Sequence, residues 1–230
     1  MMGVLANTVA IIIGGTVGAL CKKGIPEHVS DAVLKVMGAY SLCVGIIGIL
    51  KVQNMLVLLV AMVLGTVVGE LIDIDGAVNR LGKKLESRAA AGGSKISGGF
   101  ITGTLLFCVG AMAIVGSIQS GAAGDHTTLY TKSVMDAIGS LMLASGMGIG
   151  IAFSAVSILV YEGAIALLSG VLAPVLTDAM LAEITAAGSL MILLLGFNIM
   201  GLTKIKVANL LPAVVFAPFL SVAFTALHIG

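Results

Sequence analysis

Charged residues are scarce in this sequence. Asp, Glu, Lys and Arg together make up 10% of the 230 residues, whereas 59% are apolar. A soluble domain usually carries about 25% charged residues. So few charges cannot solvate the surface of a globule of this size, and the mean hydropathy is +1.18. The composition therefore excludes an ordinary soluble domain and predicts an all-α, polytopic membrane protein.

Aromatic residues and cysteines are also few. The chain has no Trp and only 4% aromatic residues, so the usual aromatic belt at the membrane interface is thin. The three cysteines fall inside apolar runs, are odd in number and lack metal-ligand spacing. They indicate packing rather than a disulfide framework. The first apolar run begins at Gly3 without preceding basic residues, which argues against a cleaved signal peptide.

The sequence shows no signature of nucleic-acid binding, metal binding or catalysis. The net charge of +1 gives no reason to expect nucleic acid as a partner. The three histidines are scattered and form no metal cluster. Nucleophile elbows, phosphate loops and zinc-protease motifs are missing from the sequence. We therefore expect no enzyme activity, cofactor or metal.

The apolar runs predict about eight crossings of a bilayer, which needs about 20 helical residues per crossing. Ser30 or Asp31 is the expected N-cap of the second run and Asn54 that of the third. The long apolar stretch after Val134 is divided at Gly146–Gly150 into two spans. The predicted spans cover roughly residues 3–21, 30–50, 55–72 and 97–118, then two spans within 134–168, and finally 177–200 and 210–228.

Lys and Arg placement orients these spans. Residues 73–95 are the one truly polar segment, with several of the basic residues, and read as a short amphipathic helix with a small-residue linker on the cytoplasmic membrane surface. With that segment inside, only Lys51 and Lys132 fall outside, in agreement with the positive-inside rule. Merging spans five and six would move Lys204 and Lys206 outward, so eight spans are favoured over seven. Both termini are then external.

The chain repeats itself. KVQNML at 51–56 returns as KVANLL at 206–211, and an upstream match at constant offset aligns 9–34 with 156–181. The copies are 1–72 and 151–230, each with three spans, and the two spans within 96–150 separate them. Because one copy starts outside and the other inside, they have opposite orientations. Inverted repeats of this kind build many secondary transporters.

We therefore expect a secondary transporter of a small solute or ion, working by alternating access between the two repeats around a polar cavity near the midplane. Two alternatives stay open at this point. One is an ion channel or passive pore of the same architecture, and the other is a membrane scaffold or sensor that transports nothing.

Ionisable groups at membrane depth are costly and mark function or internal pairing. Glu162 is the main candidate, either as a proton or cation site or as a neutral carboxyl bonded locally. Glu183 is a secondary candidate, and Glu70 lies near the inner end of its span, where it can reach the headgroups. Asp31, Asp136 and Asp178 are interpreted as carboxylates at helix starts.

Further polar residues complete the predicted ion or solute site. Asn7 and Asn198 lie in apolar runs and need hydrogen-bond partners, so they serve as interhelical contacts or as ligands. Residues 116–132 place polar groups, among them Ser117, Gln119 and Asp125, around a helix end and a helix start. This stretch reads either as a broken helix that holds an ion or as an ordinary capped external loop.

Glycines recur at close-packing spacing, as in Gly65-x-x-x-Gly69, which supports either tight helix packing or a homo-oligomer. Finally, FCVGAMAIVGSIQSG (107–121), GDHTTLYTKS (124–133) and KIKVANLLP (204–212) resemble the YqgA-like bacterial inner-membrane proteins, a domain-of-unknown-function family. The resemblance covers essentially the whole chain. It implies a protein of the bacterial cytoplasmic membrane and no particular substrate.

Overall fold

The computed structural model describes residues 1–21, 26–77, 80, 96–108 and 111–227, and all its regular structure in these residues is helical. Lipid offers no hydrogen bonds to the backbone, so an apolar chain in a bilayer satisfies its N–H and C=O groups within helices. Most of the predicted amphipathic segment at 73–95 lies outside the described residues. Its first part, residues 74–77, is helical.

The helices agree well with the predicted spans in five places. They are α1 (Met2–Cys21), α3 (Met55–Ile72), α8 (Gly150–Leu167), α10 (Asp178–Ile199) and α11 (Pro212–Ala226), the last preceded by the short 3-10 helix η2 (Val207–Leu210). Asn54 is confirmed as the N-cap of α3, since its side chain accepts hydrogen bonds from the backbone N–H groups of Leu56 and Val57.

Three predicted spans need correction. Helix α2 (Glu27–Ile49) starts earlier than predicted, so neither Ser30 nor Asp31 is its N-cap. Asp31 lies inside the helix and pairs with Lys35 at 2.7 Å. Predicted span four is two helices, α5 (Ile96–Cys108) and α6 (Ala111–Ala122), with an angle of 64° between them. Helix α7 (Thr127–Met147) also starts earlier, which places Asp136 well inside it.

The break between α7 and α8 is confirmed at Gly148, whose φ of 88° suits glycine. The short helix α9 (Ser169–Leu172) follows α8. Of the helices in the described residues, six are long and apolar enough to cross a membrane, and the bent pair of α5 and α6 makes up to seven. The polar helix α7 is not one of them, so the count of exactly eight spans stays a prediction.

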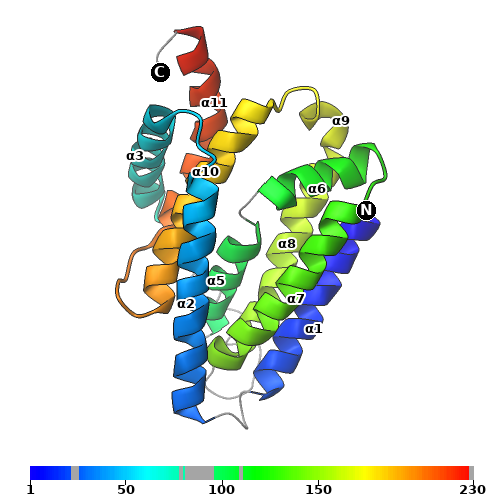
Figure 1. Ribbon diagram of the computed structural model, residues 1–230, viewed down its shortest axis with the longest axis vertical. Coiled ribbons are helices and arrows are strands. Elements are labelled where there is room, and N and C mark those ends of the chain that lie inside the picture. The colour runs from blue at the N-terminus through cyan, green and yellow to red at the C-terminus, as the bar shows by residue number, and fades with distance from the viewer. Residues whose placement is uncertain (22–25, 78–79, 81–95, 109–110, 228–230) are drawn as a thin grey trace. The chain divides into compact units, whose positions relative to one another are not determined.

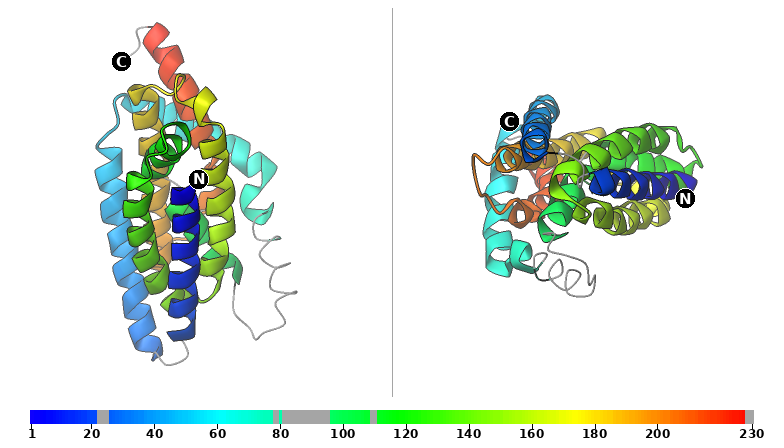
Figure 2. Two further views of the ribbon diagram at one scale, coloured as in Figure 1. Left: turned by 90° about the vertical axis from the view of Figure 1, so that its right-hand side faces the viewer. Right: turned by 90° about the horizontal axis from the view of Figure 1, so that it is seen from below.

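The chain forms two compact units. Unit 1 comprises Met1–Met37, Val78–Cys108 and Met112–Ala173, and unit 2 comprises Gly38–Ala77, Val109–Ala111 and Pro174–Gly230. In unit 1, α1 lies between α7 and α8, and α5 packs on α8 (Figures 1 and 2). In unit 2, α11 packs against both α3 and α10 (Figure 1). Each unit thus combines helices from both sequence copies.

Each helix of the first copy packs against its own counterpart in the second, and the two run in opposite directions. Helix α1 places Gly15, near its end, against Ala152, near the start of α8. Likewise α3 places Gly65 against Ala213 of α11. In unit 2 the later part of α2 meets α10 with Gly38 beside Gly196 and Gly48 beside Ser189. All three pairs are therefore antiparallel.

The two KVxN copies lie at opposite ends of α3. Asn54 caps the start of α3, whereas Asn209 contacts Gly69 near its end and accepts a hydrogen bond of 2.7 Å from the backbone N–H of Asp75. At 1.5 Å per residue, 18 helical residues span about 27 Å, close to the thickness of a bilayer core.

The glycine pairs serve packing within the chain. A Cβ on Gly69 would overlap the carbonyl oxygen of Asn209, and one on Gly18 would overlap that of Leu141 in α7. Gly99 and Gly103 face Gly150–Ser154 of α8 in the same way, and Gly146 faces Leu34. Their spacing is therefore explained without a second copy of the protein.

Candidate functional site

Four polar side chains meet inside unit 1, and all are almost fully buried. They are Asn7 on α1, Lys132 and Asp136 on α7, and Glu162 on α8. We call them the buried cluster. Asn7 and Glu162 have 0% exposure, and Lys132 and Asp136 have 6% and 8%. Charges at such depth are stable only when they are paired or neutralised.

Helix geometry brings the four together. Lys132 and Asp136 are one turn apart on α7, so their side chains share a face, and Lys132 Nζ donates a hydrogen bond to Asp136 Oδ2. The antiparallel packing of α1 on α8 sets Asn7, near the start of α1, opposite Glu162 in the second half of α8. Asn7 Nδ2 then donates a hydrogen bond of 2.9 Å to Glu162 Oε1.

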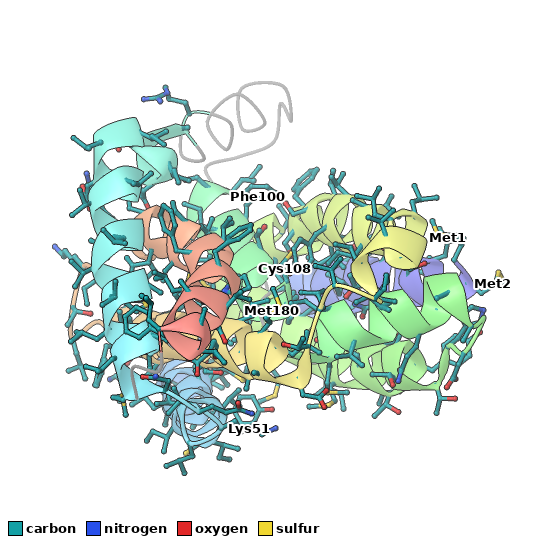
Figure 3. All side chains as sticks on the ribbon, turned by 90° about the horizontal axis from the view of Figure 1, so that it is seen from above. Met1, Met2, Lys51, Phe100, Cys108 and Met180 are labelled. Carbon is teal, nitrogen blue, oxygen red and sulfur yellow. The ribbon has the colours of Figure 1, made fainter. Side chains whose placement is uncertain are left out.

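Lys132 joins the two carboxylates. Its Nζ lies 3.5 Å from Glu162 Oε1 as well as bonding to Asp136. The Cys108 thiol, at the end of α5, is near enough to interact electrostatically with all three charged groups, and it lies among packed side chains (Figure 3). The four cluster residues therefore come from three helices of unit 1, and α5 adds Cys108 beside them.

The cluster contains two carboxyl groups and a single ammonium group. With both acids ionised it carries one net negative charge. It also leaves two buried acceptors without a hydrogen-bond partner among the described residues, namely Asn7 Oδ1 and Glu162 Oε2. A buried polar atom without a partner costs about 1–3 kcal/mol. Such a site is suited to accept one positive charge.

Sequence reasoning found half of this cluster. Glu162 and Asn7 were both predicted as site residues, and the structure places them in direct contact. Lys132 was assigned to an external loop and Asp136 to a helix start, and both assignments are wrong, because α7 begins at Thr127 and buries the two side chains. The spacing of Lys132 and Asp136, one helical turn apart, was the available signal.

The predicted polar residues of 116–132 lie on α6 and in the loop that follows it. Ser117 is fully buried on α6, and its hydroxyl has no partner within the described part of the chain. Gln119 Oε1 accepts a hydrogen bond of 2.7 Å from the Thr128 hydroxyl. Asp125 is exposed and accepts a hydrogen bond from the Thr127 backbone N–H, which lowers the pKa of its carboxyl group.

The remaining candidates belong to unit 2 and hold its helix connections. Glu183 is 1% exposed, and its Oε1 accepts hydrogen bonds from the backbone N–H groups of Gln53 and Asn54, at 3.1 and 2.7 Å. These bonds fix the turn before α3. Glu70 is half exposed and pairs with Lys206 at 3.8 Å.

Asn198 and Asp178 also have structural contacts in unit 2. Asn198 is half-buried and binds the loop after α10 through the Thr203 hydroxyl and the backbone of Ile205. Asp178 is confirmed at a helix start, as the first residue of α10, with Thr177 as the N-cap.

The fold and the buried cluster define a polytopic helical membrane protein with ionisable groups in its interior. The chain belongs to the family described as "Protein of unknown function (DUF554)", whose model matches residues 2–222. It is 32% identical over 222 residues to "Uncharacterized membrane protein YdfK" of Bacillus subtilis (strain 168), covering 95% of this chain and 94% of that protein.

A second relative is "Uncharacterized protein YqgA" of Escherichia coli (strain K12). It is 29% identical over 231 residues, covering 98% of each chain. The predicted family is thereby confirmed. No solved structure matches this chain.

Proposed function

We propose that this protein is a secondary transporter of a small solute or ion in the bacterial cytoplasmic membrane, with both termini outside. It works by alternating access between two inverted three-helix repeats, one formed by α1, α2 and α3 and the other by α8, α10 and α11. Glu162 is its ion-coupling residue.

The observation that carries the proposal is the position of Glu162. This carboxyl group lies where α1 of one copy meets α8 of the other, and one of its oxygens has no partner in the described structure. A shift of α1 along α8 changes the contacts of that carboxyl group directly. Ion binding at Glu162 and movement between the copies are therefore energetically linked.

The antiparallel pairs support inverted repeats. Helices that repeat in sequence but point in opposite directions are the local signature of two copies related by an axis in the membrane plane. Such copies give inward-open and outward-open states of similar energy. Nothing in the buried cluster resembles a nucleophile with its base, so we propose no catalytic role.

The test is electrical. Purified protein in liposomes, adsorbed on a solid-supported membrane, is exposed to jumps of H⁺, Na⁺, K⁺, amino acids and small carboxylic acids. We expect a transient, saturable current with at least one of these, which Glu162→Gln abolishes or makes independent of pH. Glu70→Gln, at a half-exposed carboxylate of unit 2, is the matched control and keeps the current.

Two results would overturn the proposal. A sustained conductance in planar bilayers that needs no second ion would identify a channel. The absence of both current and conductance, in protein that is folded by circular dichroism, would favour a scaffold or sensor.

A further inference from the structure

We propose that the ion bound by Glu162 is a proton, held on Oε2 and shared with Asn7 Oδ1, so that the two side chains form a reciprocal pair of hydrogen bonds. The inference deepens the proposed function, because it names the coupling ion of the same site.

One proton can satisfy both of the oxygen atoms that lack a partner in the Asn7–Glu162 contact. Asn7 Nδ2 already donates to Glu162 Oε1 at 2.9 Å. Within the described chain, the atoms left over on these two side chains are Asn7 Oδ1 and Glu162 Oε2, and both have only lone pairs when Glu162 is ionised. Adding one proton to Oε2 turns it into a donor and leaves Oδ1 as its acceptor. A single proton thus satisfies both atoms.

A bound proton also neutralises the net charge of the buried cluster. The titratable groups that face Glu162 are Lys132 and Asp136 on α7 and Cys108 on α5; α1 contributes the neutral amide of Asn7, and Tyr161 neighbours Glu162 on α8. Asp136 holds the ammonium group of Lys132 by a direct hydrogen bond, and Glu162 lies farther from it, at 3.5 Å. Transfer of a proton from hydronium to Oε2 breaks one O–H bond of hydronium, forms the carboxylic O–H bond and releases water, and it brings the cluster from one negative charge to zero.

The groups around Glu162 suit a proton better than a metal cation. Hard metal ions take several oxygen ligands, roughly six to eight for Ca²⁺. In the described residues, no group of three or more His, Cys, Asp and Glu is placed to hold a metal ion. A proton needs only one acceptor, and Asn7 Oδ1 provides it.

Infrared difference spectroscopy of the purified, reconstituted protein tests this directly, because a protonated carboxyl group has a C=O stretching band that a carboxylate lacks. We expect a pH-dependent protonated-acid band in the wild-type protein. It is lost in Glu162→Gln, moves in Asn7→Leu because one hydrogen bond is gone, and is unchanged in Glu70→Gln.

The proposal is overturned if folded wild-type protein shows no protonated-acid band that depends on Glu162. It is also overturned if that band responds to Na⁺ at constant pH, or if Asn7→Leu leaves it in place. The measurement needs no transport. A Glu162-dependent band in a protein that moves no solute would therefore support the proton site and overturn the proposed transport function. Transport without such a band would support the transport function and overturn the proton site.

Discussion

Asn7 and Glu162 are joined by a hydrogen bond of 2.9 Å between two helices whose sequences echo each other. Both side chains are fully buried, and each keeps one oxygen without a partner within the described residues. The contact ties the start of α1 to the second half of α8. It thus links the stability of unit 1 to the chemistry proposed for it.

Removing Lys132 should destabilise the protein strongly. Lys132→Met leaves Asp136 and Glu162 without their shared cation, and loss of one partner of a buried ion pair costs about 3–5 kcal/mol. Thermal unfolding in detergent, followed by circular dichroism, measures this as a lowered midpoint.

The matched control for this change is the double variant Lys132→Met with Asp136→Leu. It should recover most of the loss, because replacing both members of a buried ion pair by apolar residues is often nearly neutral. If Lys132→Met alone is as stable as the wild type, the Lys132 ammonium group is not buried between the two carboxyl groups.

Asn7→Leu should destabilise unit 1 by about 1–3 kcal/mol, because it removes the donor to a buried carboxyl group. Thr8→Val is the matched control at the next position. Among the described residues, the Thr8 hydroxyl donates a hydrogen bond to the Val4 carbonyl of its own helix and to no other group, so its loss should matter less. Equal unfolding midpoints for the two variants would show that the Asn7–Glu162 hydrogen bond stabilises the protein no more than the Thr8–Val4 hydrogen bond does.

Gly69→Ala should destabilise unit 2, because the new Cβ would overlap the backbone of Asn209 and push α3 away from α11. Overpacking of this kind costs about 1–3 kcal/mol. Gly98→Ala is the control: no residue of another described element lies within 4 Å of its added Cβ, and alanine favours the helix by up to about 1 kcal/mol. The prediction fails if both variants raise the unfolding temperature.

The two KVxN hairpins should lie on opposite sides of the membrane. In a variant whose three native cysteines are replaced, Gln53→Cys and Lys204→Cys introduce single exposed thiols. A membrane-impermeant maleimide added to intact cells should label only the first, since Lys204 and Lys206 are predicted inside. Labelling of both positions from the same side would rule out the inverted repeat.

The sequence alone determined that the protein lies in a membrane and where most of its helices fall. A chain with 10% charged residues cannot cover itself with polar surface, and each apolar run then has only one way to satisfy its backbone in lipid. The bounds of α3 and its Asn54 cap followed from local residue types, because a cap acts within a few positions of itself. The sequence repeat was also visible in the residue pattern, as were Asn7 and Glu162 as separate candidates for the site.

Only the tertiary structure decided what those residues contact. It placed Asn7 against Glu162, moved Lys132 and Asp136 from a loop and a helix start into the interior, and turned Glu183 into the acceptor that fixes the turn before α3. The physical reason is that a buried charge is satisfied by whichever partner the helix packing brings within hydrogen-bonding distance. That partner is more than 100 positions away in the chain for both Glu162 and Glu183, and no local pattern records it.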